Sequence, residues 1–582
     1  ISLQGTKKAY TSIAASSITG AIGVVIRVTW LKSMVIVSPG KTSSTYAGIR
    51  SPVLYVVLYS FERSKRDLCF STPGICDEVL PGDTITMDFN HVTRMTTPIA
   101  PVMDEAAMDV YAFFVPCRLI WNHWREFWGE NNSTHWEQPV EYEIPSINAP
   151  SGGWTEGSLA DYLGIPIGVE LEGVNHLPFR AYAKIVNDWF RDENLKDPCY
   201  ITMDETTVSG KNKGLNYDYV TDIECGAAPY KVAKWHDYFT SALPEPQKGP
   251  DVNIPLGSTA PIIGAEYLTN SATDTNFPGN IFEIGNNGSQ YIVQAYDKDT
   301  QTTYNLTQNT GTSLAVDLSE ATAATINQLR QAFAVQRFYE AQARGGSRYI
   351  EFIKNIFGVT SPDARQQRSE YLGGKRFPIN MDQVLQTSAT DITSPQGNTA
   401  AFSCTINSDN LFTYSATEHG YLFVLTCIRT NHSYQQGLNK MWLRKKWTDF
   451  YVPQFANLGE MPIYNAEIYA QDSDVVDADT GEVVNDQVFG YQEAWAEYRY
   501  KPNMITGKLR STANGSLDLW HYADYYTELP KLSGEWIDET EANVQRTLAV
   551  QTEPQFIMDS YFKSTWTRVM PLYSVPGLLD HH

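Results

Sequence analysis

The stretch from residue 77 to residue 128 begins with alternating hydrophobic and polar side chains, and this alternation predicts a β-strand. It opens with the turn-forming sequence Leu-Pro-Gly-Asp at residues 80–83, in which Pro fixes φ and Gly accepts a positive φ. Ile85, Met87 and Phe89 follow at every second position. They are therefore expected on one face of a strand, with polar residues on the other face.

Two longer runs are almost continuously apolar, which is the pattern of a strand covered on both faces. Residues 108–115 form the first run, and residues 421–429 form the second, which we expect to be a central strand. Residues 53–58 are a further candidate strand. Shorter alternating runs at residues 290–296 and 302–306 predict β-hairpins.

Several other segments place apolar side chains on one helical face, at spacings of three and four residues. Ser319 can cap the longest of them, Gly345 and Gly346 end it, and Gly358 closes the next one. Pro178 fits an early helical position. The expected helices are residues 121–128, 158–163, 179–194, 232–243, 319–343 and 348–357.

Composition agrees with a chain rich in β-structure and loops. The 582 residues allow either about two to four average domains or one β domain with large insertions. Aromatic residues make up 12% of the chain, and 39 Gly and 30 Pro residues supply turns. Charged residues make up only 19%. Low charge together with many Tyr and Trp side chains is typical of contact surfaces, because interface cores have this composition.

The net charge of −22 argues against a chain that coats nucleic acid with its whole surface. Any phosphate contact must come from a local basic patch. The seven Cys residues include no Cys-x-x-Cys pair, and Cys117, Cys404 and Cys427 stand in apolar, strand-like sequence. This pattern favours buried free thiols over a disulfide framework.

Residues 18–38 are the segment to test for membrane insertion. Arg27 and Lys32 interrupt the apolar run, so it holds no uncharged stretch long enough to cross a bilayer. A β-prone run follows directly and no small-residue cleavage site stands out, which argues against a signal peptide. We therefore expect a soluble chain without membrane insertion, in which this segment forms buried or contact strands.

Residues that could carry catalysis are not arranged in a familiar motif. The sequence contains no G-x-S-x-G elbow, no H-E-x-x-H zinc motif, no phosphate-binding G-x-x-x-x-G-K-[ST] and no Rossmann glycine pattern. The ten His residues are dispersed. The 66 acidic residues and many Trp residues would suit a carbohydrate site, but no spacing singles out a pair of carboxylates. We therefore predict a protein that is not an enzyme and that uses no cofactor.

The segment at residues 439–449 interleaves basic and aromatic side chains and is the best candidate for nucleic-acid contact. Its cations could neutralise phosphates while its aromatic rings stack on unpaired bases. An equally good interpretation is a surface helix or strand whose Trp residues are buried. The candidate contact residues are Lys440, Arg444, Lys445, Lys446 and Trp447.

Residues 472–482 form an acidic, turn-rich segment that loosely resembles a calcium loop. Hard cations prefer several carboxylates on a short turn, and Asp477 and Asp479 are weak calcium candidates. The spacing and flanking helices of an EF-hand are missing. A solvated hairpin tip is therefore the favoured interpretation, and no metal is predicted.

Many long stretches of the chain match one known family, in the family's own order. They are FERSKRDLCF, DEVLPGDT, TTPIAPVMDEAAMDVYAFFVP, VAKWHDYFTSALPEPQKG, INQLRQAFAVQRFYEAQARGGSRYIEFIKNIFGVTSPDARQQRSEYLGG, EHGYLFVLTCIRTNHSYQQGL, FGYQEAWAEYRYKPNMITG and SVPGLLDHH. From about Phe61 to its C-terminus the chain resembles the major capsid protein of the Microviridae, which are small single-stranded-DNA bacteriophages, and of their gokushovirus branch in particular. Residues 1–60 depart from the resemblance, because they do not read like the polar N-terminal arm expected of this family.

This resemblance implies a mainly β fold, namely an eight-stranded antiparallel viral jelly roll with large helical and loop insertions. It implies that sixty copies, arranged as pentamers, build a T=1 icosahedral shell around a circular single-stranded DNA genome. The implied partners are a small basic DNA-binding protein, an internal scaffolding protein and a pilot protein. The implied location is the virion, assembled in the bacterial host cytoplasm. A separate basic protein would reconcile the net charge of −22 with genome packaging.

The resemblance divides the chain into four parts. Residues 1–60 are an arm of uncertain role, residues 61–257 hold the first part of the jelly roll with helical insertions, and residues 319–582 hold helices, the remaining strands and a C-terminal extension. Residues 258–318 are rich in Asn, Thr, Ser, Gln and Gly, and we expect a variable surface insertion that protrudes at the three-fold axes and meets the host surface. Its candidate host-contact residues are Tyr267, Phe277, Tyr291, Tyr296 and Tyr304.

Two alternatives stay open from the sequence. A β-rich carbohydrate-binding or glycoside-hydrolysing protein would fit the aromatic and acidic composition, and a jelly-roll module of a non-viral assembly would fit the predicted strands. Closed, uniform shells in electron microscopy would favour the capsid interpretation, whereas monomers with glycan affinity would favour the first alternative.

Overall fold

Antiparallel sheets dominate the part of the chain that the structure describes, so the prediction of a mainly β chain is confirmed. The structure is a computed structural model. It describes residues 53–66, 70–130, 141–214, 216–250, 326–380, 404–552 and 554–569, together with residue 252 and short strands between residues 262 and 402. The apolar segment at residues 18–38 lies outside the described residues.

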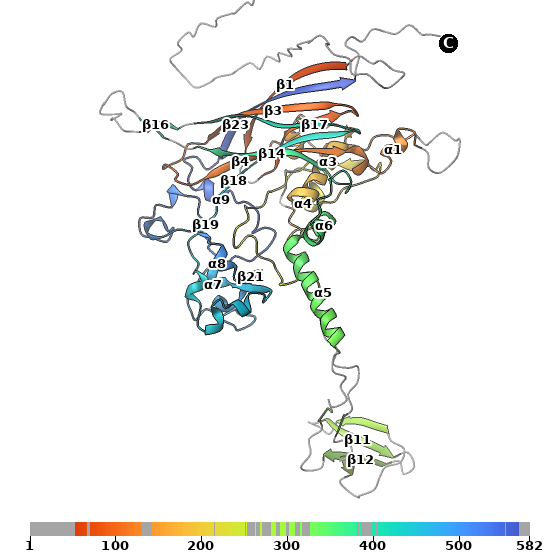
Figure 1. Ribbon diagram of the computed structural model, residues 1–582, viewed down its shortest axis with the longest axis vertical. Helices are drawn as coiled ribbons and strands as arrows, with labels where there is room; N and C mark the ends of the chain where they lie inside the picture. Colours follow the sequence, from red (N-terminus) through yellow and green to blue (C-terminus); the bar gives the residue numbers. More distant parts are fainter. Residues whose placement is uncertain are drawn as a thin grey trace, which may run out of the picture.

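Two four-stranded antiparallel sheets form the body of the molecule and lie one above the other (Figure 1). The first sheet has the strand order β1-β23-β3-β17, and the second sheet has the order β14-β4-β18-β2. The predicted boundary between residues 60 and 61 falls inside β1. The strands are β1 (Val53–Arg66), β2 (Thr72–Val79), β3 (Thr84–Met95), β4 (Ala106–Pro116), β14 (Glu370–Ile379), β17 (Thr405–Ser415), β18 (Gly420–Thr430) and β23 (Phe556–Val569).

Apolar side chains from both sheets fill the space between them. On β3, Ile85, Met87 and Phe89 are fully buried, whereas Thr84 and Thr86 are only partly buried. The predicted alternation is therefore confirmed. These β3 side chains pack with residues of β4, β18 and β23 in one continuous core.

A tight turn joins β2 to β3, as the sequence predicts. Gly82 has a φ of 89°, a conformation that favours glycine. The Asp83 carboxylate accepts the Leu80 N–H at 2.8 Å and pairs with Arg568 of β23 at 2.6 Å. The turn is thereby fixed to the first sheet.

The second sheet is covered on its other face by a second apolar core. Its central strands β4 and β18 are buried along nearly their whole length, which confirms the prediction from their continuous apolar runs. Phe113 on β4 and Phe423 on β18 belong to this second core. The cover comes from the chain between β4 and β14, chiefly from helix α3 (Leu177–Ile185), whose Phe179 and Tyr182 are buried.

Four of the expected helices are present, and cap residues mark their ends. The Ser158 side chain caps α2 by accepting the N–H of Asp161. Gly358 ends α6 with a left-handed φ of 69°. The predicted cap of α5, Ser319, lies outside the described residues. The four helices are α2 (Leu159–Tyr162), α3, which runs on into a π-helix at Val186–Phe190, α5 (Ile326–Gly345) and α6 (Tyr349–Phe357).

The helix predicted at residues 121–128 is shorter in the structure. Helix α1 (Trp124–Phe127) covers only four of these residues. Trp121 is fully buried ahead of the helix, and Trp128 after it is 60% exposed. The aromatic spacing therefore reflects packing of single rings more than one continuous helical face.

The helix predicted at residues 232–243 is wrong. The Asp237 carboxylate accepts the N–H groups of Phe239 and Thr240 at 2.9 and 2.8 Å, which makes a local turn. Just before it, residues 231 and 233 form β-bridges to residues 70 and 538. Such side-chain-to-backbone hydrogen bonds compete with a helix, and the apolar spacing does not reveal them.

Residues 433–545, between β18 and β23, form a further packed unit that we call the lobe. Its apolar core includes Tyr434, Ile463 and Phe489. Figure 1 shows the lobe on the side of the second sheet, beside α5. Its elements are β19 (Ser433–Tyr434), β20 (Glu460–Tyr464), α7 (Asn465–Ile468), β21 (Val488–Glu493), α8 (Ala496–Arg499), β22 (Asn503–Met504) and α9 (Ala542–Gln545).

A small antiparallel sheet stands at the far end of α5 from the two large sheets (Figure 1). Its order is β10-β11-β12-β9, and β11 and β12 pair as the predicted hairpin. The strands are β9 (Leu268–Asn270), β10 (Ile281–Asn286), β11 (Tyr291–Asp297) and β12 (Thr302–Gln308), and β8 (Ile262–Ile263) pairs with β13 (Ala315–Val316). The remaining elements are β5 (Ser146–Asn148), β6 (Val174–Asn175), β7 (Val208–Ser209), α4 (Tyr219–Asp222), β15 (Gln383–Leu385) and β16 (Thr399–Phe402).

The six cysteines that the structure describes are all free thiols, as predicted for them. Four of the six are buried, but Cys404 is exposed, contrary to the apolar setting that its sequence suggests.

Within the described residues, no helix has the length and apolar character needed to cross a bilayer.

The imidazole of His432 joins the end of β18 to the lobe through two buried carboxylates. Its Nδ1 lies 2.7 Å from Asp524 Oδ2, and its Nε2 lies 3.3 Å from Glu539 Oε2. Burial alone would lower the pKa of His432, but the two carboxylates outweigh burial and raise the pKa to about 10. Burial would likewise raise the pKa of Asp524, and the cationic ring lowers it instead. The ring is therefore charged at neutral pH and donates both hydrogen bonds.

We expect the stabilisation from His432 to fall as the pH rises. Its pKa increases from the ordinary 6.5 to about 10 on folding, so the contribution is complete below pH 6.5 and is lost as the pH rises through about 10. Across that window the free energy of unfolding of the wild type should fall, relative to His432→Gln, by roughly 1 kcal/mol per pH unit. Denaturant titrations of both proteins at pH values spanning the window measure this difference. A difference that stays constant with pH contradicts a charged His432.

Candidate functional site

The segment predicted to contact nucleic acid lies on the surface of the lobe as two short 3-10 turns. They span Lys440–Trp442 and Trp447–Asp449. The Asn439 side chain caps the first turn by accepting the N–H of Met441 at 3.1 Å. Neither a regular helix nor a strand forms here, so that part of the alternative interpretation is wrong.

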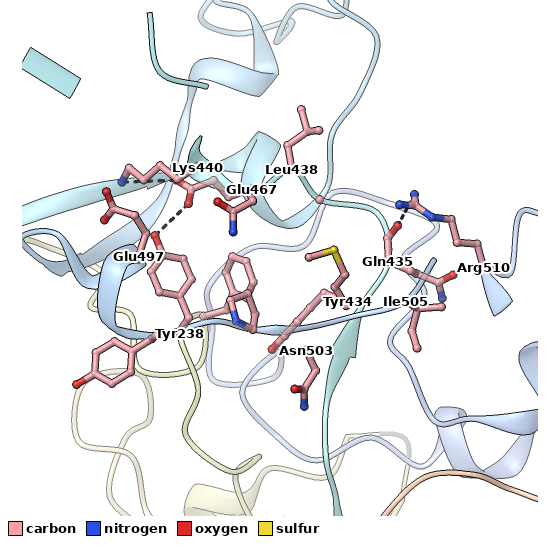
Figure 2. Close-up of a pocket in the computed structure, with 16 residues that line it drawn as sticks. Tyr238, Tyr434, Gln435, Leu438, Lys440, Glu467, Glu497, Asn503, Ile505 and Arg510 are labelled. Carbon is pink, nitrogen blue, oxygen red and sulfur yellow. Dashed lines mark hydrogen bonds and ion pairs between the residues drawn. The ribbon is translucent and has the colours of Figure 1, made fainter. Parts of the chain in front are cut away.

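Lys440 turns inward and is not available to a ligand. Its Nζ donates to the Pro462 carbonyl at 2.6 Å and lies 3.6 Å from Glu467 Oε1. Figure 2 shows Lys440, Glu467 and Tyr238 meeting at one side of a small pocket, where the Tyr238 hydroxyl donates to Glu467 at 3.0 Å. Burial raises the pKa of Glu467, and the ammonium group of Lys440 opposes this shift. Lys440 therefore neutralises a buried carboxylate.

Arg444 is also committed to the interior of the lobe. It donates to Glu497 Oε1 at 3.0 Å, and the two side chains are only 11% and 8% exposed. Its guanidinium group lies 4.5 Å from the ring centre of Tyr498 and 5.4 Å from that of Phe450. These contacts hold the segment against α8.

Lys445 and Lys446 point to solvent. Their backbone N–H groups each donate to Asp449 Oδ2 at 2.8 Å, and these hydrogen bonds lower the pKa of Asp449. Their side chains form no ion pair within the described residues. The backbone under both lysines is therefore fixed while their ammonium groups stay exposed.

The tryptophans of this segment are exposed, so the interpretation with buried Trp is wrong. Trp442 and Trp447 are each 71% exposed. Of the five predicted contact residues, the structure keeps Lys445, Lys446 and Trp447 together on the surface and commits the other two cations to the interior. Nucleic-acid contact at these three residues stays a prediction.

Exposed aromatic residues precede and follow the two lysines in the chain, at Trp442, Trp447 and Phe450. The ring centres of Trp447 and Phe455 are 5.9 Å apart, and those of Tyr451 and Tyr498 are 6.3 Å apart. Exposed apolar side chains grouped this closely mark a contact site. We call this group the aromatic surface, and its apolar members are 48–71% exposed. It consists of Met441, Trp442, Lys445, Lys446, Trp447, Phe450, Tyr451 and Tyr498.

The acidic segment at residues 472–482 is a hairpin tip. Val476 and Val483 form a β-bridge, and the Asp477 carboxylate accepts the N–H groups two and three residues later at 2.8 and 3.0 Å. These hydrogen bonds lower the pKa of Asp477 and fix the turn. Across the described ranges, no group of three or more His, Cys, Asp or Glu side chains is arranged to hold a metal ion. The favoured interpretation of this segment as a hairpin tip is confirmed, and calcium binding at Asp477 and Asp479 is not tested.

The predicted host-contact residues belong to the insertion that carries the small sheet. Tyr267 and Phe277 lie outside the described residues. Tyr291 and Tyr296 lie on β11, and Tyr304 lies on the adjacent strand β12, opposite residue 295. The backbone therefore brings three of the five residues onto neighbouring strands.

A cavity that the sequence did not predict lies against the outer face of the second sheet. Its volume is about 610 Å³, and aromatic and basic side chains line it. Arg376 and Arg429 both pair with Asp109, the first at 2.6 Å, and the Arg376 guanidinium stacks on Trp235 at 4.2 Å. Burial would raise the pKa of Asp109, but the two guanidinium groups lower it. These four residues come from segments far apart in the chain, so no local spacing could have grouped them.

Neither the large cavity nor the pocket in Figure 2 suits glycoside hydrolysis, which needs two suitably spaced carboxylates. No Asp or Glu lines the large cavity. Glu467 and Glu497 line the small pocket, but Lys440 and Tyr238 bind the first carboxylate and Arg444 pairs with the second. These two sites therefore give no support to the hydrolase alternative.

Comparison with known proteins places this chain among viral coat proteins. Residues 69–578 match the protein family described as capsid protein (F protein). The chain is 43% identical over 513 residues to capsid protein VP1 of Spiroplasma virus 4, covering 86% of this chain and 90% of the relative. It is 41% identical over 522 residues to capsid protein VP1 of Bdellovibrio phage phiMH2K, covering 87% and 92%. It is 38% identical over 579 residues to capsid protein VP1 of Chlamydia phage 1, covering 89% and 95%.

We expect Arg444→Ala to destabilise the protein by about 3 kcal/mol, because it leaves the Glu497 carboxylate nearly buried without its partner. The matched control Lys445→Ala/Lys446→Ala removes two exposed ammonium groups and should change the free energy of unfolding by less than about 0.5 kcal/mol. Denaturant unfolding of the three proteins measures both effects. Equal losses of unfolding free energy in the two variants would contradict a stabilising role of the Arg444–Glu497 pair.

Proposed function

This chain belongs to the phage capsid protein (F protein) family, and from that premise we propose that sixty copies of it build a T=1 icosahedral shell around a circular single-stranded DNA genome. Its relatives are capsid proteins of bacterial viruses, and this chain is a major capsid protein of the same type. We further propose that pentamers are the building units, that assembly takes place in the host cytoplasm and that the product is the virion.

The order of the strands is the observation that carries this proposal. Numbered one to eight along the chain, the strands of the two large sheets pair in the orders 1-8-3-6 and 5-4-7-2. Pairing of the first strand with the last and of the third with the sixth is the order of two Greek keys combined in a viral jelly roll. This order supports an eight-stranded jelly roll whose long insertions fall between β4 and β14 and between β18 and β23.

The proposed function is geometric and needs no catalysis. A low charged fraction of 19% and exposed aromatic groups on the lobe support contacts on several sides of each copy. Contacts between unlike surfaces close into rings when their rotation closes, and symmetry then satisfies every interface. In this proposal the two sheets fix the shape of the subunit and the insertions supply the contacts.

The genome needs positive charge that this chain does not supply overall. The net charge is −22, so the average surface repels phosphate groups. We propose that a small basic DNA-binding protein helps to neutralise the genome inside the shell. An internal scaffolding protein and a pilot protein complete the proposed set of partners.

We propose that residues 258–318 protrude at the three-fold axes and contact the bacterial host. Helix α5 has 20 residues, which corresponds to about 30 Å, and the small sheet stands beyond its end (Figure 1). The lobe lies on the same side of the large sheets. A shell that turns the small sheet outward therefore turns Lys445, Lys446 and Trp447 away from the genome, which makes nucleic-acid contact there the weaker proposal.

Protein produced together with the proposed scaffolding protein should assemble into closed shells of one diameter, because each copy carries all of the contacts that the symmetry uses in the finished shell. Negative-stain electron microscopy and mass measurement test this, and sixty copies of a 65.4 kDa chain give a particle of about 3.9 MDa. Monomers that bind glycans would instead support the carbohydrate-binding alternative, and open or irregular aggregates would contradict a T=1 shell.

Deletion of residues 259–316, with a short Gly-Ser linker in their place, should leave shell assembly intact and reduce adsorption of the virus to its host. The reason is that the small sheet stands apart from the two large sheets, so its loss removes none of their core. Gradient sedimentation measures assembly, and binding of particles to host cells measures adsorption. A deleted chain that stays unassembled, or that adsorbs normally, would contradict this division of labour.

A further inference from the structure

The aromatic surface of the lobe has the properties of a contact site that a second macromolecule must cover. Trp442 and Trp447 are each 71% exposed, and Phe450 is 52% exposed. Large aromatic side chains at the centre of a patch supply most of the binding energy of protein interfaces. Exposure of several large aromatic side chains to water is unfavourable, so we expect a binding partner to cover the patch.

This surface is also held rigid before any partner binds. Arg444 Nη2, on the interior side of the surface, lies 3.0 Å from Glu497 Oε1. The Trp495 Nε1–H donates to the Phe455 carbonyl at 2.8 Å. The Asp449 carboxylate fixes the backbone under the two exposed lysines. A surface that is ordered in advance loses little conformational entropy on binding.

The acidic hairpin at residues 472–482 has complementary properties. Asp472, Asp474, Asp479 and Glu482 are exposed, and Val476 beside them is 54% exposed. Residues 447–498 contain eleven acidic residues and no Lys or Arg, so no cation of this stretch neutralises the hairpin. Its turn is fixed by the Asp477 carboxylate.

We propose that the acidic hairpin of one copy binds the aromatic surface of a neighbouring copy in the shell. The carboxylates of the hairpin would face Lys445 and Lys446, and Val476 would pack on the exposed tryptophans. Each copy carries one hairpin and one aromatic surface, which are unlike, so the contact repeats from copy to copy and closes a ring. This inference rests on the proposed function, because it requires that copies of the chain assemble.

A second copy fits this surface better than nucleic acid does. Only two exposed lysines are available, since Lys440 and Arg444 are paired inside the lobe. Within the described residues, no hairpin carboxylate of the same chain pairs with Lys445 or Lys446, so both sides are open for a contact between copies. Opposite charges on the two sides also give the contact its register.

Charge reversal tests the pairing. Lys445→Glu/Lys446→Glu should lower the yield of shells by roughly tenfold or more, because it places like charges opposite one another. Asp474→Lys/Asp479→Lys should lower the yield similarly. The combined four-residue variant reverses both sides and should restore shells, which a mere folding defect would not do. Gradient sedimentation and electron microscopy give the yield, and circular dichroism of the unassembled fraction checks folding.

The control Lys508→Glu/Lys531→Glu makes the same change in charge at two exposed lysines outside the aromatic surface and should leave shells intact. Loss of shells in this control, or failure of the combined variant to restore them, would overturn the pairing. Normal shells with reduced DNA content in Lys445→Glu/Lys446→Glu would overturn it too and would assign the surface to nucleic acid. Wild-type protein that forms no shells at all would refute the proposed function itself, which separates the two failures.

Discussion

Strands β4 and β18 lie at the centre of the second sheet and are buried on both faces, which means that the sheet needs two apolar covers. The first sheet supplies one cover. The chain between β4 and β14 supplies the other, and there the ring centre of Tyr182 on α3 lies 6.5 Å from that of Phe423 on β18. The early part of this insertion is therefore a structural layer of the subunit. Only the later part, with α5 and the small sheet, extends away from the body and is available for contacts of its own.

The lobe shows how one short segment divides its charges between folding and contact. Residues 440–446 contain four cations. Lys440 and Arg444 neutralise carboxylates inside the lobe, whereas Lys445 and Lys446 face solvent beside exposed tryptophans. The direction of each side chain depends on two 3-10 turns and their caps. A basic segment in a strongly acidic chain can thus serve mainly to bind the chain's own carboxylates, with only the remainder available to partners.

The sequence predicted the strands and helices correctly where buried residues recur at a regular spacing along the chain. The alternation in β3, the continuous apolar runs of β4 and β18, and the helix end at Gly358 all correspond to observed elements. It failed at residues 232–243, where hydrogen bonds from Asp237 make a turn despite a helical apolar spacing. It could not group Asp109 with Arg376, because only the pairing of distant strands brings them together. The sequence shows that residues 440–446 contain four cations, but the direction of each side chain depends on partners elsewhere in the lobe.

The position of β23 has a consequence for how the subunit is made. This strand lies between β1 and β3, so the two earliest strands of the first sheet are joined through the last one. While the chain is still being synthesised, β1 and β3 each lack a neighbour, and the sheet cannot close until residues 556–569 have left the ribosome. A chain cut short anywhere before β23 keeps open strand edges and cannot complete the sheet. Completion of the first sheet therefore depends on the last of its four strands.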